Sequence, residues 1–191
     1  MNILSREATQ HLSSASETAG TATDVLFQAI GECALGKVLV ARSANGVCAI
    51  LLGDDASELE ADLAKRFPKA TLVSNEVMVR DDLAKINRYV DNPSEGLDLP
   101  LDMRGTPIQR RVWQMIRTIP VGQTRSYMQL ARLINCVYPS VGARVVANAC
   151  AANPIALAVP CHRVIRTNGE LAGYRWGLMR KRELLEKEAA A

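Results

Sequence analysis

Long apolar runs, histidines and paired cysteines are scarce or absent in this sequence, and each absence excludes a class of protein. No stretch approaches the roughly 20 apolar residues that cross a bilayer, and residues 1–10 are too polar for the hydrophobic region of a secretory signal. The five cysteines include no Cys-x-x-Cys pair and there are two histidines, so neither a disulfide framework nor a structural zinc site is expected. We therefore expect a cytoplasmic protein with no membrane contact, no metal and no cofactor.

Charge is unevenly distributed along the 191 residues. Residues 1–100 carry 9 Lys and Arg against 15 Asp and Glu, whereas residues 101–191 carry 14 against 5, and most of these 14 are arginines. Arginine stays charged and binds phosphate through two parallel hydrogen bonds. The second half is therefore predicted to bind a polyanion, although a solvated helical surface would give the same composition.

The chain divides into a polar N-terminal lead-in and two parts that differ in the spacing of their apolar residues. Residues 1–23 are mostly small and polar without a sustained period, which predicts a flexible segment. Residues 24–103 contain short runs of Val, Ile and Leu, and Asn45-Gly46 between two of them predicts a β-hairpin. Apolar residues at helical spacing dominate residues 104–191. The sequence thus predicts an α/β domain followed by a mainly helical domain.

Turn and cap signals give the expected order of elements. The first part is expected to contain strands at 25–33, 37–42, 46–52 and 70–73, helices at 56–66 and 76–90, and either a last strand or a linker at 97–103. The second part is expected to contain helices at 107–119, 127–134, 142–152 and 177–188. Thr106 and Ser126 are the expected N-caps. Two short helices joined by a tight connection are typical of a helix-turn-helix.

Cys161 is the candidate nucleophile. A proline precedes it, His162 follows it, and Arg163 and Arg166 lie close by in the sequence. A thiol near cations ionises more readily, and the thiolate is the reactive form. Most free cysteines are buried small hydrophobic residues, so a Cys-His pair alone is weak evidence. Neighbouring side chains of an extended segment point apart, so we expect His162 to act on the sulfur through a bridging water rather than directly in a turn.

A histidine that acts as a base needs a third group to fix its tautomer, and three glutamates of the last helix are candidates. Glu183 and Glu186 each have a basic residue four positions away that explains their presence as solvated ion pairs. Glu188 has no such partner.

The helix expected at 142–152 carries Arg144 among small residues. Small side chains would let its backbone approach DNA closely while Arg144 enters the groove or the base stack. Tight packing against neighbouring helices, with Arg144 at the surface, is the alternative. Tyr127 is more often a packing residue than a functional one.

Together these residues resemble the O6-methylguanine-DNA methyltransferases, especially the C-terminal part of bacterial Ada proteins. The resemblance covers residues 35–188. Its carriers are Pro160-Cys161-His162-Arg163-Val164, Asn153-Pro154, Arg144-Val145-Val146, Ser126-Tyr127 and Gly173-Tyr174-Arg175-Trp176-Gly177.

The resemblance implies roles for five residues. Cys161 would accept the alkyl group, His162 would activate it through water, and Glu188 would orient His162. Asn153 would brace the active-site turn, and Tyr127 would assist base flipping and protonate the departing guanine. It also implies a ribonuclease-H-like N-terminal domain and a C-terminal DNA-binding domain whose helix-turn-helix enters the minor groove.

Further residues are expected to contact DNA or the alkyl group. Arg144 would replace the flipped base. The other expected DNA contacts are Ala143, Val145, Ala147, Ser126 and Thr106, and the expected pocket residues are Tyr174, Leu171, Arg175, Trp176, Val164 and Cys150. Two features depart from the family pattern, since the connection at 135–141 is longer than usual and Val145 stands where alanine is common.

The leading hypothesis is stoichiometric, irreversible transfer of an alkyl group from O6-alkylguanine in double-stranded DNA to Cys161, by a monomer associated with the nucleoid. Activity on O4-alkylthymine is left open. A non-catalytic alkyl-lesion-binding protein is the alternative, and the presence of Cys161 argues against it. A cysteine hydrolase using Cys161, His162 and Glu188 and a structural basic domain with an inert cysteine are the remaining hypotheses.

Overall fold

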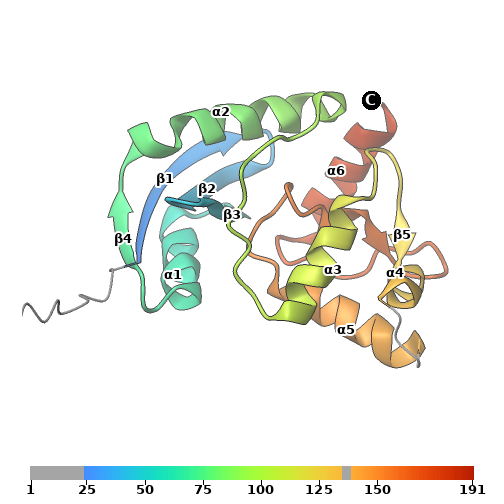
Figure 1. Cartoon of the computed structure of the whole chain (residues 1–191). Helices are drawn as coiled ribbons and strands as arrows, with labels where there is room; N and C mark the ends of the chain where they lie inside the picture. Colours follow the sequence, from blue (N-terminus) through green and yellow to red (C-terminus); the bar gives the residue numbers. More distant parts are fainter. Residues whose placement is uncertain (1–23, 135–138) are drawn as a thin grey trace, which may run out of the picture.

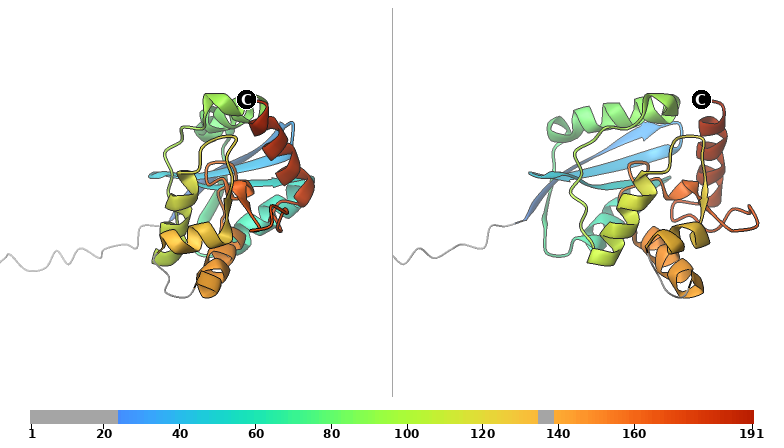
Figure 2. Two further views of the ribbon diagram at one scale, coloured as in Figure 1. Left: turned by 90° about the vertical axis from the view of Figure 1, so that its right-hand side faces the viewer. Right: turned by 45° about the vertical axis from the view of Figure 1, so that its right-hand side comes forward.

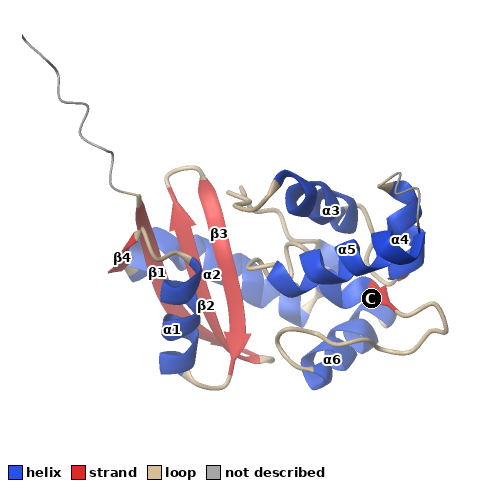
Figure 3. Cartoon of the chain, turned by 90° about the horizontal axis from the view of Figure 1, so that it is seen from below, coloured by secondary structure: helices blue, strands red, loops and turns tan. Residues whose placement is uncertain are grey.

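A computed structural model describes residues 24–134 and 139–191 of the chain (Figure 1). The expected lead-in at 1–23 and most of the connection at 135–141 lie outside the described residues. The described chain consists of a four-stranded sheet with helices on both faces, followed by a group of helices beside one edge of the sheet (Figures 1 and 3). Within the described ranges no helix is long and apolar enough to span a membrane.

The sheet is built from a meander of three antiparallel strands and one parallel strand. Its strands are β1 (Val25–Cys33), β2 (Gly36–Ser43), β3 (Gly46–Gly53) and β4 (Thr71–Ser74), in the order β3-β2-β1-β4 with β4 parallel to β1. The expected hairpin is present, and Gly46 has a positive φ of 137°. A Cβ there would lie 2.4 Å from the Pro100 carbonyl oxygen, so only glycine fits both the turn and this close contact.

Two helices cover the two faces of the sheet (Figure 3). Helix α1 (Ala56–Arg66) is capped by Asp55, and α2 (Glu76–Asp91) is capped by Asn75. Each helix buries an apolar stripe at helical spacing, because one side faces the sheet and the other faces water.

The second part of the chain is mainly helical. It contains α3 (Pro107–Arg117), α4 (Tyr127–Leu133), α5 (Pro139–Ala152) and α6 (Leu178–Ala189), the short parallel strands β5 (Arg125–Ser126) and β6 (Val164–Ile165), and a 3₁₀ turn, η2 (Cys161–Arg163); another such turn, η1 (Pro93–Glu95), follows α2. Thr106 and Ser126 are the N-caps of α3 and α4, as expected, and they also form capping boxes with Gln109 and Gln129.

One expectation needs correction, and one open alternative is resolved. Helix α5 begins at Pro139, three residues before the expected start at 142, because proline is well suited to the first turn of a helix. Of the two alternatives for residues 97–103, a last strand or a linker, the structure has the linker, with one isolated bridge between Leu101 and Val47 of β3.

Candidate active site

The turn that precedes Cys161 is fixed to the edge of the sheet. Ile50 of β3 donates from its amide to the Pro154 carbonyl at 2.9 Å and accepts from the Ala156 amide at 2.9 Å. Leu157, which is buried, has a left-handed φ of 66°, a conformation that costs about 1 kcal/mol for a non-glycine residue. The sheet therefore serves as the rigid support of the turn that carries the nucleophile.

Asn153 connects this turn to the nucleophile. It is fully buried, and its Nδ2 donates to the Val159 carbonyl at 3.0 Å and to Cys161 Sγ at 3.2 Å. Its Oδ1 accepts from the Ile155 amide at 2.9 Å. One amide side chain thus closes the turn and supplies a donor that stabilises negative charge on the sulfur.

His162 is buried behind Cys161 and paired with Glu188 of α6. Nε2 lies 2.7 Å from Glu188 Oε1, and Nδ1 has no hydrogen-bond partner among the described residues. Because a carboxylate only accepts hydrogen bonds, Nε2 carries the proton and Nδ1 of the neutral ring is left as an acceptor. Burial lowers the pKa of His162 below its usual value, against the opposing effect of Glu188. The imidazole is therefore neutral near pH 7.

Glu188 is held as an anion by three neighbouring side chains, those of His162, Arg163 and Tyr89. Burial opposes its ionisation, but hydrogen bonds from His162 and Arg163 lower the pKa of Glu188 to about 2. Arg163 Nε donates to Oε2 at 2.9 Å, and the Tyr89 hydroxyl of α2 donates to Oε1 at 2.9 Å. Figure 2 shows α6 running toward the end of α2, where this network forms. Glu188 can therefore stabilise an imidazolium without itself taking up the proton.

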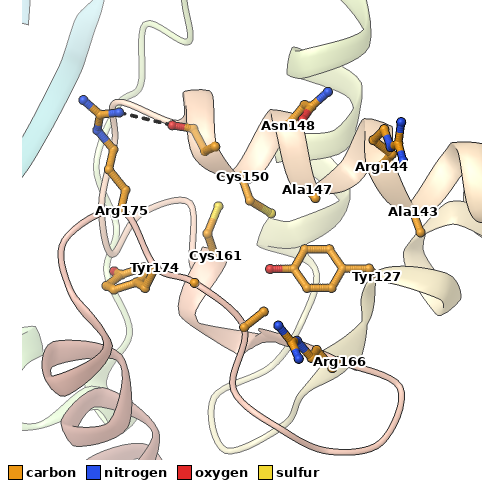
Figure 4. Close-up of a pocket in the computed structure, with 13 residues that line it drawn as sticks. Tyr127, Ala143, Arg144, Ala147, Asn148, Cys150, Cys161, Arg166, Tyr174 and Arg175 are labelled. Carbon is orange, nitrogen blue, oxygen red and sulfur yellow. Dashed lines mark hydrogen bonds between the residues drawn. The ribbon is translucent and has the colours of Figure 1, made fainter.

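Cys161 lies in a cavity of about 860 Å³ between α4, α5 and the loop before α6 (Figure 4). Helix α5 presents small residues to this cavity, with Arg144 further along the helix and its guanidinium directed away from Cys161 (Figure 4). The residues lining the cavity are Tyr127, Ala143, Arg144, Ala147, Asn148, Cys150, Ala151, Cys161, Arg166, Ala172, Gly173, Tyr174 and Arg175.

Tyr127 reaches this cavity because two distant segments pair as strands. Arg125 and Ser126 lie parallel to Val164 and Ile165, which directly follow the Cys161 turn. The Tyr127 ring consequently projects into the cavity with its hydroxyl toward the cysteines (Figure 4). Burial raises the pKa of Tyr127 to about 12, so the phenol stays protonated near pH 7.

The structure brings eight of the predicted site residues to the wall of the cavity: Tyr127, Ala143, Arg144, Ala147, Cys150, Cys161, Tyr174 and Arg175. Asn153, His162 and Glu188 lie behind Cys161 as described. Leu171, Trp176 and Val164 do not line it. Trp176 supports the wall from behind, with its ring centroid 5.1 Å from that of Tyr174.

The remaining predicted DNA contacts lie outside the cavity. Val145 packs against the core beside it, while Ser126 and Thr106 act as helix caps, with Ser126 buried and Thr106 exposed.

Sequence reasoning missed several members of the site. Tyr89 contacts Glu188 across 99 positions of sequence, and no local pattern marks it. Lys181 is fully buried and donates to the Val164 carbonyl at 2.6 Å, and its helical spacing with Leu184 and Glu188 could have shown that it faces inward. Among the described residues no group of three or more His, Cys, Asp or Glu is arranged to hold a metal.

Comparison with known proteins identifies the family. Residues 107–190 match the family model described as "6-O-methylguanine DNA methyltransferase, DNA binding domain". A methylated-DNA–protein-cysteine methyltransferase of Candida albicans is 36% identical over 173 residues, which are 85% of this chain and 96% of that relative. The chain belongs to the O6-methylguanine-DNA methyltransferase family.

Other relatives extend this comparison. The bifunctional transcriptional activator/DNA repair enzyme Ada of Escherichia coli is 47% identical over 161 residues, which are 84% of this chain and 45% of Ada. The chain thus spans less than half the length of that relative. The crystal structure of the Mycobacterium tuberculosis OGT in complex with DNA matches the fold with a TM-score of 0.67, at 32% identity, over 87% of this chain and 93% of the other.

Proposed function

We propose that the protein repairs DNA by transferring an alkyl group from O6-alkylguanine in double-stranded DNA irreversibly to Cys161. The observation that carries this proposal is the position of Cys161 Sγ in the cavity wall, with Asn153 as its donor and the His162–Glu188 pair directly behind it. Family membership supports the same reaction.

Activation begins with loss of the thiol proton. In our proposal the free Nδ1 of His162 accepts this proton through a bridging water, and Glu188 stabilises the imidazolium that results. The donor Nδ2 of Asn153 stabilises the thiolate. Arg163 and Tyr89 hold Glu188 in place from the other side.

Transfer is a single displacement. The Cys161 thiolate attacks the alkyl carbon, the carbon–O6 bond breaks, and its electron pair remains on the guanine. The Tyr127 phenol, whose pKa of about 12 keeps it protonated, donates a proton to this leaving group and regains one from His162 or solvent. The product is a thioether, and no residue of the proposed site removes the alkyl group from its sulfur. Each molecule therefore reacts once, and the reaction needs no cofactor.

Access to O6 requires the base to leave the duplex, because the reacting atom is inaccessible within the stack. We propose that α4 and α5 act as a helix-turn-helix in the minor groove, that Ala143 and Ala147 allow close approach, and that Arg144 fills the space left by the base. The sheet with α1 and α2 would be a ribonuclease-H-like domain covering residues 24–103, and the protein would act as a monomer.

The number of lesions repaired per molecule tests the proposal. Duplex DNA with one O6-methylguanine is mixed with increasing amounts of protein, and restored guanine is counted after complete reaction. The proposal predicts that restoration stops at one guanine per protein. Repeated turnover would instead favour a cysteine hydrolase, and tight binding without any restoration would favour the lesion-binding alternative.

Tyr127→Phe removes the proposed proton donor while retaining the ring. Loss of a general acid costs about 100-fold or more in rate, so single-turnover transfer from O6-methylguanine is expected to slow by this factor. Alkylation of Cys161 by iodoacetamide, whose iodide leaves without a proton, is the control and should keep its rate. An equal loss in both reactions would contradict a role as proton donor.

Arg144→Ala tests the proposed part in base flipping. The variant should transfer the methyl group more slowly from duplex DNA and at an unchanged rate from the free base, because only the duplex requires the base to be extruded. Arg182, which is exposed on α6, provides the matched variant Arg182→Ala. Similar losses for both arginine variants would indicate a general charge effect and not a role in flipping.

A further inference from the structure

A second thiol shares the cavity with the nucleophile. Cys150 lies in the last turn of α5, and its side chain faces the same space as Cys161, beside it (Figure 4). The two thiols interact: a hydrogen bond with Cys161, followed by burial, raises the pKa of Cys150 well above its usual value. Cys150 is therefore a neutral thiol next to the nucleophile, and alkyl transfer gives it no chemical task.

One residue fixes both cysteines. The Asn153 amide donates to the Cys150 carbonyl at 3.3 Å, and its side chain donates to Cys161 Sγ at 3.2 Å. The end of α5 and the Cys161 turn are thus tied to the same buried residue. Both sulfurs point into the same cavity (Figure 4).

A buried cation accompanies the pair. Lys181 of α6 is fully buried and donates to the carbonyls of Val164 at 2.6 Å and Ala172 at 3.3 Å. Burial lowers the pKa of Lys181, whereas Cys150 and Cys161 favour its charged form. A nearby ammonium group stabilises a thiolate on either sulfur, and the thiolate is the form of cysteine that reacts as a nucleophile.

We propose that Cys150 is a resolving thiol, which forms a reversible disulfide with Cys161 once a hydroperoxide has oxidised Cys161. With hydrogen peroxide, the Cys161 thiolate attacks one oxygen, the O–O bond breaks, and hydroxide leaves to become water. The sulfur of Cys150 then attacks the sulfur of the resulting sulfenic acid, the S–S bond forms, the S–O bond breaks, and the departing hydroxide takes the Cys150 proton to become a second water. The two thiols together give two electrons to the peroxide.

This disulfide would protect the protein from permanent loss of its nucleophile. Further oxidation of a sulfenic acid to sulfinic and sulfonic acid is irreversible in the absence of a dedicated repair enzyme, whereas a disulfide is returned to two thiols by exchange with a dithiol. While it persists, Cys161 can accept no alkyl group. The inference requires only the two thiols and stands independently of the proposed alkyl transfer.

The sequence offers a direct measurement. No Lys or Arg lies between Val145 and Arg163, so trypsin releases both cysteines on one peptide that contains no other cysteine. The full chain is treated with hydrogen peroxide, free thiols are blocked with N-ethylmaleimide, and the mass of the tryptic peptide is measured by mass spectrometry. We expect it to be two hydrogen atoms lighter and unlabelled, and to gain two labels if dithiothreitol is added before blocking.

Variants separate this mechanism from general oxidation. Cys150→Ala and Cys150→Ser should both convert Cys161 to sulfinic acid several-fold faster than the wild type. Cys33→Ser, which changes a half-buried thiol of β1 outside the cavity, should behave like the wild type. Equal sulfinic acid formation with and without Cys150, or a Cys161 disulfide to the peptide containing Cys136, would overturn the proposal.

Discussion

Glu188→Gln is expected to be among the most damaging substitutions in the protein, for both rate and stability. The imidazolium of His162 loses its counter-charge, which weakens a general base whose full contribution is about 10² to 10⁴ in rate. The buried Arg163 guanidinium is left without its carboxylate, and breaking a buried pair in this way costs about 3 to 5 kcal/mol. Single-turnover transfer rates and urea unfolding at pH 7 measure the two effects.

The same helix provides the control for Glu188. Glu183 forms a partly exposed pair with Lys187 at 3.4 Å, so Glu183→Gln should cost about 1 kcal/mol or less and leave transfer unchanged. Comparable losses from both substitutions would contradict the assigned network.

The effect of Glu188 on stability should depend on pH with a definite sign. The pKa of Glu188 is about 2 in the folded protein against 4.5 in the unfolded chain. The unfolded chain therefore binds the proton more readily, and the stabilisation is complete above pH 4.5 and lost as pH falls toward 2. The difference in unfolding free energy between wild type and Glu188→Gln should accordingly shrink over this range.

Asn153→Ala is expected to lower both the stability of the protein and the reactivity of Cys161. The substitution leaves the Ile155 amide buried without a partner, at a cost of about 1 to 3 kcal/mol, whereas the Val159 carbonyl keeps the hydrogen bond from the Cys161 amide at 2.7 Å. It also removes the donor to Cys161 Sγ, and a hydrogen bond to a charged group is worth about 1.5 to 3 kcal/mol, or roughly 10- to 150-fold in rate. Thermal unfolding and reaction of Cys161 with iodoacetamide measure both losses.

An exposed asparagine serves as the reference for Asn153. Asn168 makes one side-chain contact, accepting from the Glu170 amide at 3.2 Å, so Asn168→Ala should resemble the wild type in both measurements. An Asn153→Ala protein as stable and as reactive as the Asn168→Ala protein would mean that the turn is held by other contacts.

Local signals in the sequence accounted for much of the fold. Asn45-Gly46 predicted the hairpin, and the structure has a tight turn at residues 44 and 45 that is followed by Gly46 at a positive φ as the first residue of β3. The caps Thr106 and Ser126 predicted the starts of α3 and α4, since each side chain satisfies a free backbone amide. The expected start of α5 is too late because proline is common both in loops and in the first turn of a helix, where Pro139 lies.

Long-range contacts could not be derived in the same way. The sequence around Cys161 indicated the nucleophile. The pairing of Arg125 and Ser126 with β6 involves only two residues on each strand, which is too few to give a recognisable sequence pattern. Tyr89 comes from a helix of the sheet part of the chain and contacts Glu188 only because α2 and α6 meet in space. Such contacts follow from the packing of whole elements and carry no local signature.

The identity of the alkyl acceptor is the central claim, and intact-protein mass spectrometry tests it most directly. Wild type and Cys161→Ala are each mixed with excess duplex DNA that contains one O6-methylguanine, and with the same duplex unmodified. We expect the wild type alone to gain the mass of one methyl group, only with the lesion, and never more than one. A methyl group gained by Cys161→Ala, or no gain by a wild type that binds the lesion, would contradict transfer to Cys161.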